Sequence, residues 1–143
     1  MKSLLFAFLV TSSTFANVGD TEQELRKRFE NPPVVKKDPD GFLTMGFWRG
    51  KVFVAAFFVD GKVATELSTP ITMKEAVGLR DKQGSDWKVI LNTKARVIWE
   101  SKEGFRASLK TDLLSISDGR YEVAWKKLRA GKLEGPRREA DRH

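Results

Sequence analysis

The side chains that carry most enzyme chemistry are scarce in this sequence. It has no Cys, and its one His is the last residue, His143, so a thiolate nucleophile, a buried histidine base and a Cys or His metal site are excluded. Asp38 and Asp40 are two carboxylates close in sequence, a pattern compatible with general acid–base chemistry. They stand within Lys-Lys-Asp-Pro-Asp-Gly, where Asp favours a polar turn through local hydrogen bonds. We therefore predict no catalytic, cofactor-binding or metal-binding residue, and a protein that is not an enzyme.

Residues suited to binding are better represented. Phe47, Trp48 and Trp99 are large aromatic side chains of the kind that anchor protein interfaces. Each falls in a predicted strand, so the three form a candidate binding surface if helices leave one face of the sheet open. The alternative is that all three lie in the core.

The positive charge of the chain is concentrated near its end. The net charge is +7, and residues 119–143 hold 8 basic and 4 acidic side chains, more than half of that excess. Such a segment can attract the phosphates of nucleic acid or of anionic lipid headgroups. The alternative is a solvated tail that aids solubility. The candidate contacts with an anionic surface are Lys126, Lys127, Arg129, Arg137 and Arg138.

Residues 1–16 have the order of regions found in a secretory signal peptide. Lys2 precedes an apolar run over 4–10, a short polar stretch follows, and Ala16 supplies the small residue at the cleavage site. The apolar run is shorter than the roughly 20 residues that cross a bilayer as a helix. We expect a mature chain that begins at Asn17, has no transmembrane segment and is periplasmic or extracellular. The alternative is a buried strand or helix of a cytoplasmic protein.

Export narrows the expected partners. An exported protein meets little nucleic acid, which leaves another envelope protein or an anionic surface as the expected partner. The absence of Cys also excludes the lipid anchor that exported lipoproteins carry on a Cys at the cleavage site.

Local signals place the elements that must position these residues. Thr-x-x-Glu at 21–24 and at 72–75 are capping boxes, which predict the starts of two helices. Arg49-Gly50 and Asp60-Gly61 separate apolar runs, and Asp-Gly is a strong hairpin signal. Residues 51–59 are apolar on both faces, which predicts an inner strand covered on both sides. The expected helices are 21–30, 72–83 and 119–130, and the expected strands are 42–48, 51–59, 62–67, 95–100, 105–110 and 113–117.

Together these elements predict one α+β domain over 17–130. We expect two helix-plus-three-strand units, an antiparallel sheet with helices on one side, and a C-terminal helix that docks through Trp125. Residues 131–143, with Gly131, Gly135 and Pro136, are expected to form a flexible basic tail. A further short strand over 87–91 is an alternative that the sequence leaves open.

The order of these segments resembles a group of small exported bacterial proteins to which no activity is assigned. The shared features include Gly19-Asp20-Thr21 before a short helix, Gly50-Lys51 before a long apolar strand, and Trp99 before the Glu103-Gly104 turn. Glu30 departs from the group, which usually has Gly there. The helix entry is also similar to that of the BamE family of envelope lipoproteins, although the lipid-bearing Cys of that family is missing here. The first resemblance implies an exported protein, the second an envelope protein, and neither implies a catalytic residue.

Overall fold

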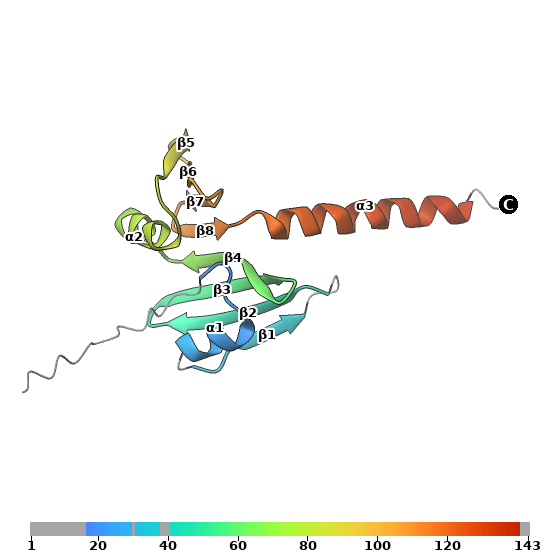
Figure 1. Ribbon diagram of the computed structural model, residues 1–143, viewed down its shortest axis with the longest axis horizontal. Helices are drawn as coiled ribbons and strands as arrows, with labels where there is room; N and C mark the ends of the chain where they lie inside the picture. Colours follow the sequence, from blue (N-terminus) through green and yellow to red (C-terminus); the bar gives the residue numbers. More distant parts are fainter. Residues whose placement is uncertain (1–16, 30, 38–40, 141–143) are drawn as a thin grey trace, which may run out of the picture.

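One antiparallel sheet of eight strands organises the chain in the computed structural model (Figure 1). The structure describes residues 17–29, 31–37 and 41–140, with the backbone alone over 132–140. The predicted signal peptide, the pair Asp38 and Asp40, and His143 therefore lie outside the described residues, as do the side chains of Arg137 and Arg138. The expected α+β class is confirmed, because three described helices accompany the sheet.

The strands follow the order β1-β2-β3-β4-β8-β7-β6-β5 across the sheet. The helices are α1 (Glu22–Arg28), α2 (Met73–Gln83) and α3 (Arg120–Ala140). The strands are β1 (Val34–Lys37), β2 (Leu43–Arg49), β3 (Val52–Val59), β4 (Lys62–Thr69), β5 (Lys88–Asn92), β6 (Arg96–Glu100), β7 (Arg106–Lys110) and β8 (Leu113–Ser117).

The two halves of the sheet have the same order of elements. α1 precedes β1 to β4, α2 precedes β5 to β8, and the pairing of β4 with β8 joins the halves. The prediction of two helix-plus-three-strand units is therefore wrong in strand number, since each unit has four. The missed strand of the first half, β1, reads Val-Val-Lys-Lys and lies exposed at the sheet edge, so it lacks the apolar alternation that marks a half-buried strand.

The local signals position the helices and hairpins as expected. The Thr21 hydroxyl accepts a hydrogen bond from the Glu24 N–H at 3.3 Å, and the Glu24 carboxylate accepts one from the Thr21 N–H at 2.8 Å. Asp60 and Gly61 both have positive φ, 51° and 76°, as a two-residue type I′ turn requires. This turn brings Val59 opposite Lys62 and so sets the register of β3 and β4.

Both α1 and α2 cover the same face of the sheet, which we call the helix face. Under α1, Leu25 and Phe29 pack on buried residues of β2, β3 and β4. Under α2, Ala76 and Leu79 pack with Trp99 and the buried residues of β7 and β8. The register aligns the two clusters on one face, because Met45 pairs with Ala56, Ala56 with Glu66, and Glu66 with Ile116. We call the opposite face the open face.

Of the two faces of strand β3, only the helix face is fully covered. Val54 and Ala56 are 0% exposed there, whereas Phe53 and Phe57, on the open face, are half-buried. The prediction that this strand is covered on both sides is therefore wrong for the end that carries Phe53, because no described helix lies over it.

The third helix begins at Arg120 and reaches Ala140, ten residues past the predicted end at 130. Its first turns contact β3 and β4, and the rest projects away from the sheet (Figure 1). Trp125 contacts the ring of Phe42, with centroids 6.4 Å apart, but Tyr121 makes closer ring contacts. In the described chain no helix combines the length and apolar character needed to cross a bilayer.

Candidate binding face

The open face is defined by the alternate residues of each strand. On β2 and β3 the cross-strand pairs that point to this face are Thr44–Phe57, Gly46–Ala55 and Trp48–Phe53. The register continues to Thr65 and Leu67 of β4, and from there to Ser117 and Ser115 of β8. On the remaining strands it includes Lys110, Ser108 and Arg106 of β7, then Arg96, Ile98 and Glu100 of β6, and Lys88 of β5.

Helix α3 covers one end of the open face. The ring of Tyr121 lies 5.2 Å from that of Phe57 and 5.3 Å from that of Phe42, measured between centroids. The guanidinium of Arg120 donates hydrogen bonds to the carbonyl oxygens of Val63 at 2.9 Å and Val59 at 3.5 Å, and its Nε lies 2.6 Å from a carboxylate oxygen of Asp118. These contacts hold the start of α3 against the β3–β4 hairpin, so the Phe57 end of the face is partly closed.

The other end of the open face is uncovered. Here the register forms one line across six strands, which we call the end row: Trp48, Phe53, Thr69, Leu113, Lys110 and Arg96. Because Ser68 pairs with Leu114, Thr69 of β4 lies beside Leu113 of β8 and completes the line. Trp48 is 55% exposed and Leu113 is 37% exposed, and the side chains of Lys110 and Arg96 are also exposed.

The aromatic part of the end row depends on a glycine. The rings of Trp48 and Phe53 are 5.1 Å apart between centroids, and the Phe53 ring lies over Gly46. A Cβ at position 46 would come within 2.6 Å of the Phe53 ring, closer than real Cβ contacts. Gly46 therefore leaves room for the end of the Phe53 ring, which contacts Trp48.

The basic part of the end row is a pair of like charges. Arg96 of β6 is the direct cross-strand partner of Lys110 of β7, and both are exposed. Like charges directly opposite each other destabilise a sheet. Among the described residues, neither side chain makes an ion pair, whereas the neighbouring Arg106 lies 3.2 Å from the carboxylate of Glu100.

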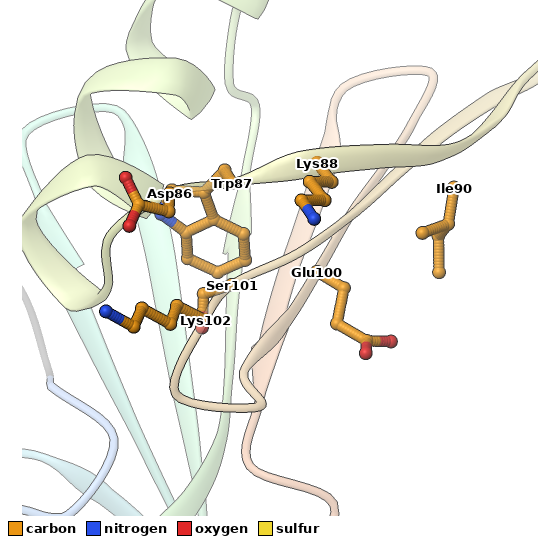
Figure 2. A pocket seen from close by; sticks show the side chains of 7 residues that line it. All are labelled: Asp86, Trp87, Lys88, Ile90, Glu100, Ser101 and Lys102. Atoms are coloured by element: carbon orange, nitrogen blue, oxygen red, sulfur yellow. The ribbon is translucent and has the colours of Figure 1, made fainter.

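Two hollows lie beside the charged strands in the second half of the sheet. The larger, of about 720 Å³, is lined by residues of β5 and β6 and of the segments next to them, and Figure 2 shows Lys88, Ile90 and Glu100 on one side of these two strands. The smaller, of about 220 Å³, shares Glu100 and reaches Gly119 at the start of α3. The Nε1 atom of Trp87, which lines the larger hollow, is buried and has no hydrogen-bond partner in the part of the chain that the structure describes. The shared Glu100 places both hollows beside the charged residues of β6 and β7.

The structure separates the three aromatic residues predicted as a binding surface. Trp48 lies exposed on the open face, but Phe47 is 1% exposed and Trp99 is 4% exposed, both on the helix face. Phe47 stacks on Phe29, the residue that follows α1, with ring centroids 4.3 Å apart, and the Arg80 guanidinium lies 4.9 Å from the Trp99 ring centroid. The prediction that Phe47 and Trp99 belong to a contact surface is therefore wrong, because α1 and α2 cover them.

The basic candidates lie apart from this face. Lys126, Lys127 and Arg129 are exposed on α3 beyond its contact with the sheet. The residues that sequence reasoning missed are Phe53, Leu113, Lys110 and Arg96. Their types are ordinary, and what singles them out is a register that brings six strands into one line.

One carboxyl group on the helix face is buried between the two core clusters. Glu66 is 5% exposed and accepts a hydrogen bond from the Ser68 hydroxyl at 3.1 Å. Loss of hydration raises the pKa of Glu66 from 4.5 to about 8, while the hydrogen bond from Ser68 and the charges of Arg49 and Arg28 act in the opposite direction. Its burial keeps it away from any substrate. Within residues 17–29, 31–37 and 41–140, no group of three or more acidic or histidine side chains is arranged to hold a metal.

Comparison with protein-family models, with curated proteins and with solved structures found no match to this chain. The resemblances to small exported proteins and to the BamE family stay predictions.

Proposed function

We propose that this protein is an exported, non-enzymatic binding module that holds a protein partner against the open face of its sheet. The single observation that carries the proposal is the exposed end row, which runs from Trp48 to Arg96 across six strands. Neighbouring strands lie about 4.8 Å apart, so Trp48 and Lys110, four strands apart, are separated by about 19 Å. That span suits a protein surface better than a small ligand.

The chemistry of the row favours a protein contact. Trp is enriched among the residues that dominate binding energy, and Trp48 presents more than half of its surface to solvent. Farther along the open face, Thr69 lies opposite Phe53 and Ser115 lies two residues from Leu113, and small hydroxyl side chains of this kind suit the polar rim of a protein interface. An aromatic anchor with a polar surround is the usual anatomy of such an interface.

The proposal is tested by placing a photoreactive phenylalanine analogue at Trp48 and irradiating cells of the native host. We expect one adduct of defined mass with a protein partner. The matched control is the same analogue at Met73, which is 48% exposed on α2, on the other side of the sheet. An adduct of equal yield at Met73, or none at Trp48, would contradict the proposal.

Export is tested separately by the intact mass of the protein recovered from its host. We expect a chain that begins at Asn17 and is found outside the cytoplasm. A chain that begins at Met1 in the cytoplasm would show that the first sixteen residues are retained and would remove the envelope from the proposal.

A second candidate function is contact with an anionic surface through α3. The observation that favours it is the exposure of Lys126, Lys127 and Arg129 on a helix that projects from the body (Figure 1). Phosphatidylglycerol vesicles should bind the protein, phosphatidylcholine vesicles should not, and Lys126→Glu with Lys127→Glu should abolish the binding. Preferential binding to a DNA duplex would indicate nucleic acid instead, and binding to neither would reject this candidate.

A further inference from the structure

The open face of the second half has an excess of basic side chains. Lys88, Arg96, Arg106 and Lys110 point to this face, and Glu100 is the one acidic residue that these strands place there. Glu100 is the cross-strand partner of both Lys88 and Arg106, and its ion pair is with Arg106. Arg96 and Lys110 are left facing each other without an acidic neighbour in the register.

Among the described residues, no ion pair of Arg96 or Lys110 offsets this arrangement. Two exposed cations on opposed positions repel each other, and a carboxylate at either position would convert the repulsion into an attraction. The same two strands do make that favourable pair between Glu100 and Arg106, so they accommodate it readily. The like-charge pair lies at one end of the end row, on the same line as Trp48 and Leu113.

We propose that the partner is a protein that presents an acidic segment to Arg96 and Lys110 while its apolar side chains cover Trp48, Phe53 and Leu113. The inference rests on the proposed function and specifies the partner for that same face. A carboxylate between Arg96 and Lys110 attracts both side chains and offsets one of their two charges, so it weakens the repulsion that the free protein carries. Binding then stabilises the sheet at the rung where its own side chains repel each other.

The choice of an acidic protein over other anions comes from the composition of the row. A lipid headgroup offers a phosphate without apolar groups, and the bases of a nucleic acid can stack on Trp48 but offer little aliphatic surface to cover Leu113, which is 37% exposed. The end row also lies on the sheet, away from Lys126, Lys127 and Arg129 of α3, the side chains available for a bilayer surface. One surface that is apolar at one end and anionic at the other fits the row as a whole.

The test uses Lys110→Glu in the full chain. Because the new carboxylate would face Arg96, we expect the melting temperature to rise by about 1 to 3 °C. The same change should reduce the photo-cross-linked adduct at Trp48 at least tenfold, since the partner's carboxylates would be repelled. The matched control is Lys74→Glu, the same change of charge at an exposed position of α2, which should leave the adduct unchanged.

A defined probe makes the result independent of the identity of the partner. A poly-glutamate peptide should shift the amide resonances of Arg96, Arg106 and Lys110, and added salt should reverse the shifts because exposed charges are screened. Poly-lysine should have no effect, and Lys110→Glu should abolish the shifts.

The outcomes separate this inference from the proposed function. An undiminished Trp48 adduct in Lys110→Glu would overturn the acidic partner and leave protein binding standing. No adduct at Trp48 in any variant would overturn both. Shifts that are absent from β6 and β7, or a DNA duplex that displaces poly-glutamate from them, would overturn the acidic protein partner.

Discussion

The two faces of the sheet use neighbouring aromatic residues in opposite ways. Phe47 on the helix face is 1% exposed and stacks on Phe29, while the next residue, Trp48 on the open face, is 55% exposed and contacts Phe53. Alternation along β2 sends the two side chains to opposite faces, and α1 covers one of them. The same strand therefore contributes both to the core and to the candidate binding face.

The comparison extends to polar residues. The helix face buries a carboxyl group, Glu66, whereas the open face keeps its charges in solvent, with Arg96 opposite Lys110. A charge in the core costs stability unless it is neutralised, but an exposed like-charge pair costs much less. The open face can thus keep an unfavourable arrangement that the helix face could not.

The largest expected effect separates the two faces within one strand. Phe47→Asp would place an unpaired charge in the core, which costs several kcal/mol, so we expect this variant to be unfolded. Trp48→Asp should fold, with a free energy of unfolding within about 1 kcal/mol of the wild type, because its side chain is largely solvated. Circular dichroism during thermal denaturation measures both. Similar losses in the two variants would mean that the open face is also core.

The second effect concerns the buried acid of the helix face. With a folded-state pKa of about 8 and an unfolded value near 4.5, Glu66 holds its proton in the folded state over the interval between them. The folded state binds the extra proton there, so the contribution of Glu66 to stability falls as pH rises from about 4.5 to about 8.

Glu66→Gln removes the titrating group and keeps an acceptor for the Ser68 hydroxyl. Urea denaturation should show the variant close to wild type at pH 4.5 and more stable than wild type at pH 8.5. If the free energies of unfolding of the two proteins changed in parallel with pH, Glu66 would have an ordinary pKa and this part of the helix face would be hydrated.

The contrast between the faces explains what sequence alone could predict. The helix starts at Glu22 and Met73 and the turn at Asp60-Gly61 follow from local hydrogen bonding and positive φ, and their positions were predicted. Alternation in 51–59 also separated Phe53 and Phe57 from Val54 and Ala56. Alternation does not tell which set the helices cover, and for that reason Phe47 and Trp48 could not be distinguished.

The basic part of the end row could not be predicted from local sequence patterns. Lys110 and Arg96 come together through the β6–β7 register, and their alignment with Trp48 depends on the pairing of β4 with β8. That pairing joins strands that are separated by α2 and three strands in sequence, and no local pattern specifies it. The helix end at 130 is predicted from Gly131, Gly135 and Pro136, which cost about 1 kcal/mol for each Gly and about 3 kcal/mol for Pro in a helix interior, whereas the backbone of α3 stays helical through all three.

A third, smaller effect measures how firmly α3 closes its end of the open face. Phe57→Ala and Tyr121→Ala remove the two rings that lie 5.2 Å apart. In a double-mutant cycle the coupling energy should be about 0.5 to 1.5 kcal/mol, the usual value for an aromatic pair. The control cycle is Phe57→Ala with Trp48→Ala, at the other end of the same face. A coupling below the error of the measurement in both cycles would mean that α3 does not close the Phe57 end.

The smallest effect on stability should come from Gly46→Ala, although it changes the shape of the open face. The new methyl group would meet the far edge of the Phe53 ring, which is half-buried and can turn aside, so the melting temperature should fall by no more than about 2 to 4 °C. Turning Phe53 breaks its contact with Trp48, and the Trp48 adduct should therefore decline. Gly78→Ala is the control, because nothing lies within 4 Å of a Cβ there and Ala favours the helix, so that variant should be slightly more stable with the adduct unchanged.

If Gly46→Ala kept the full adduct yield, the partner would be recognised without the Trp48–Phe53 pair, and the aromatic end of the row would lose its role. If it unfolded the protein, Phe53 would belong to a core that extends through both faces of β3.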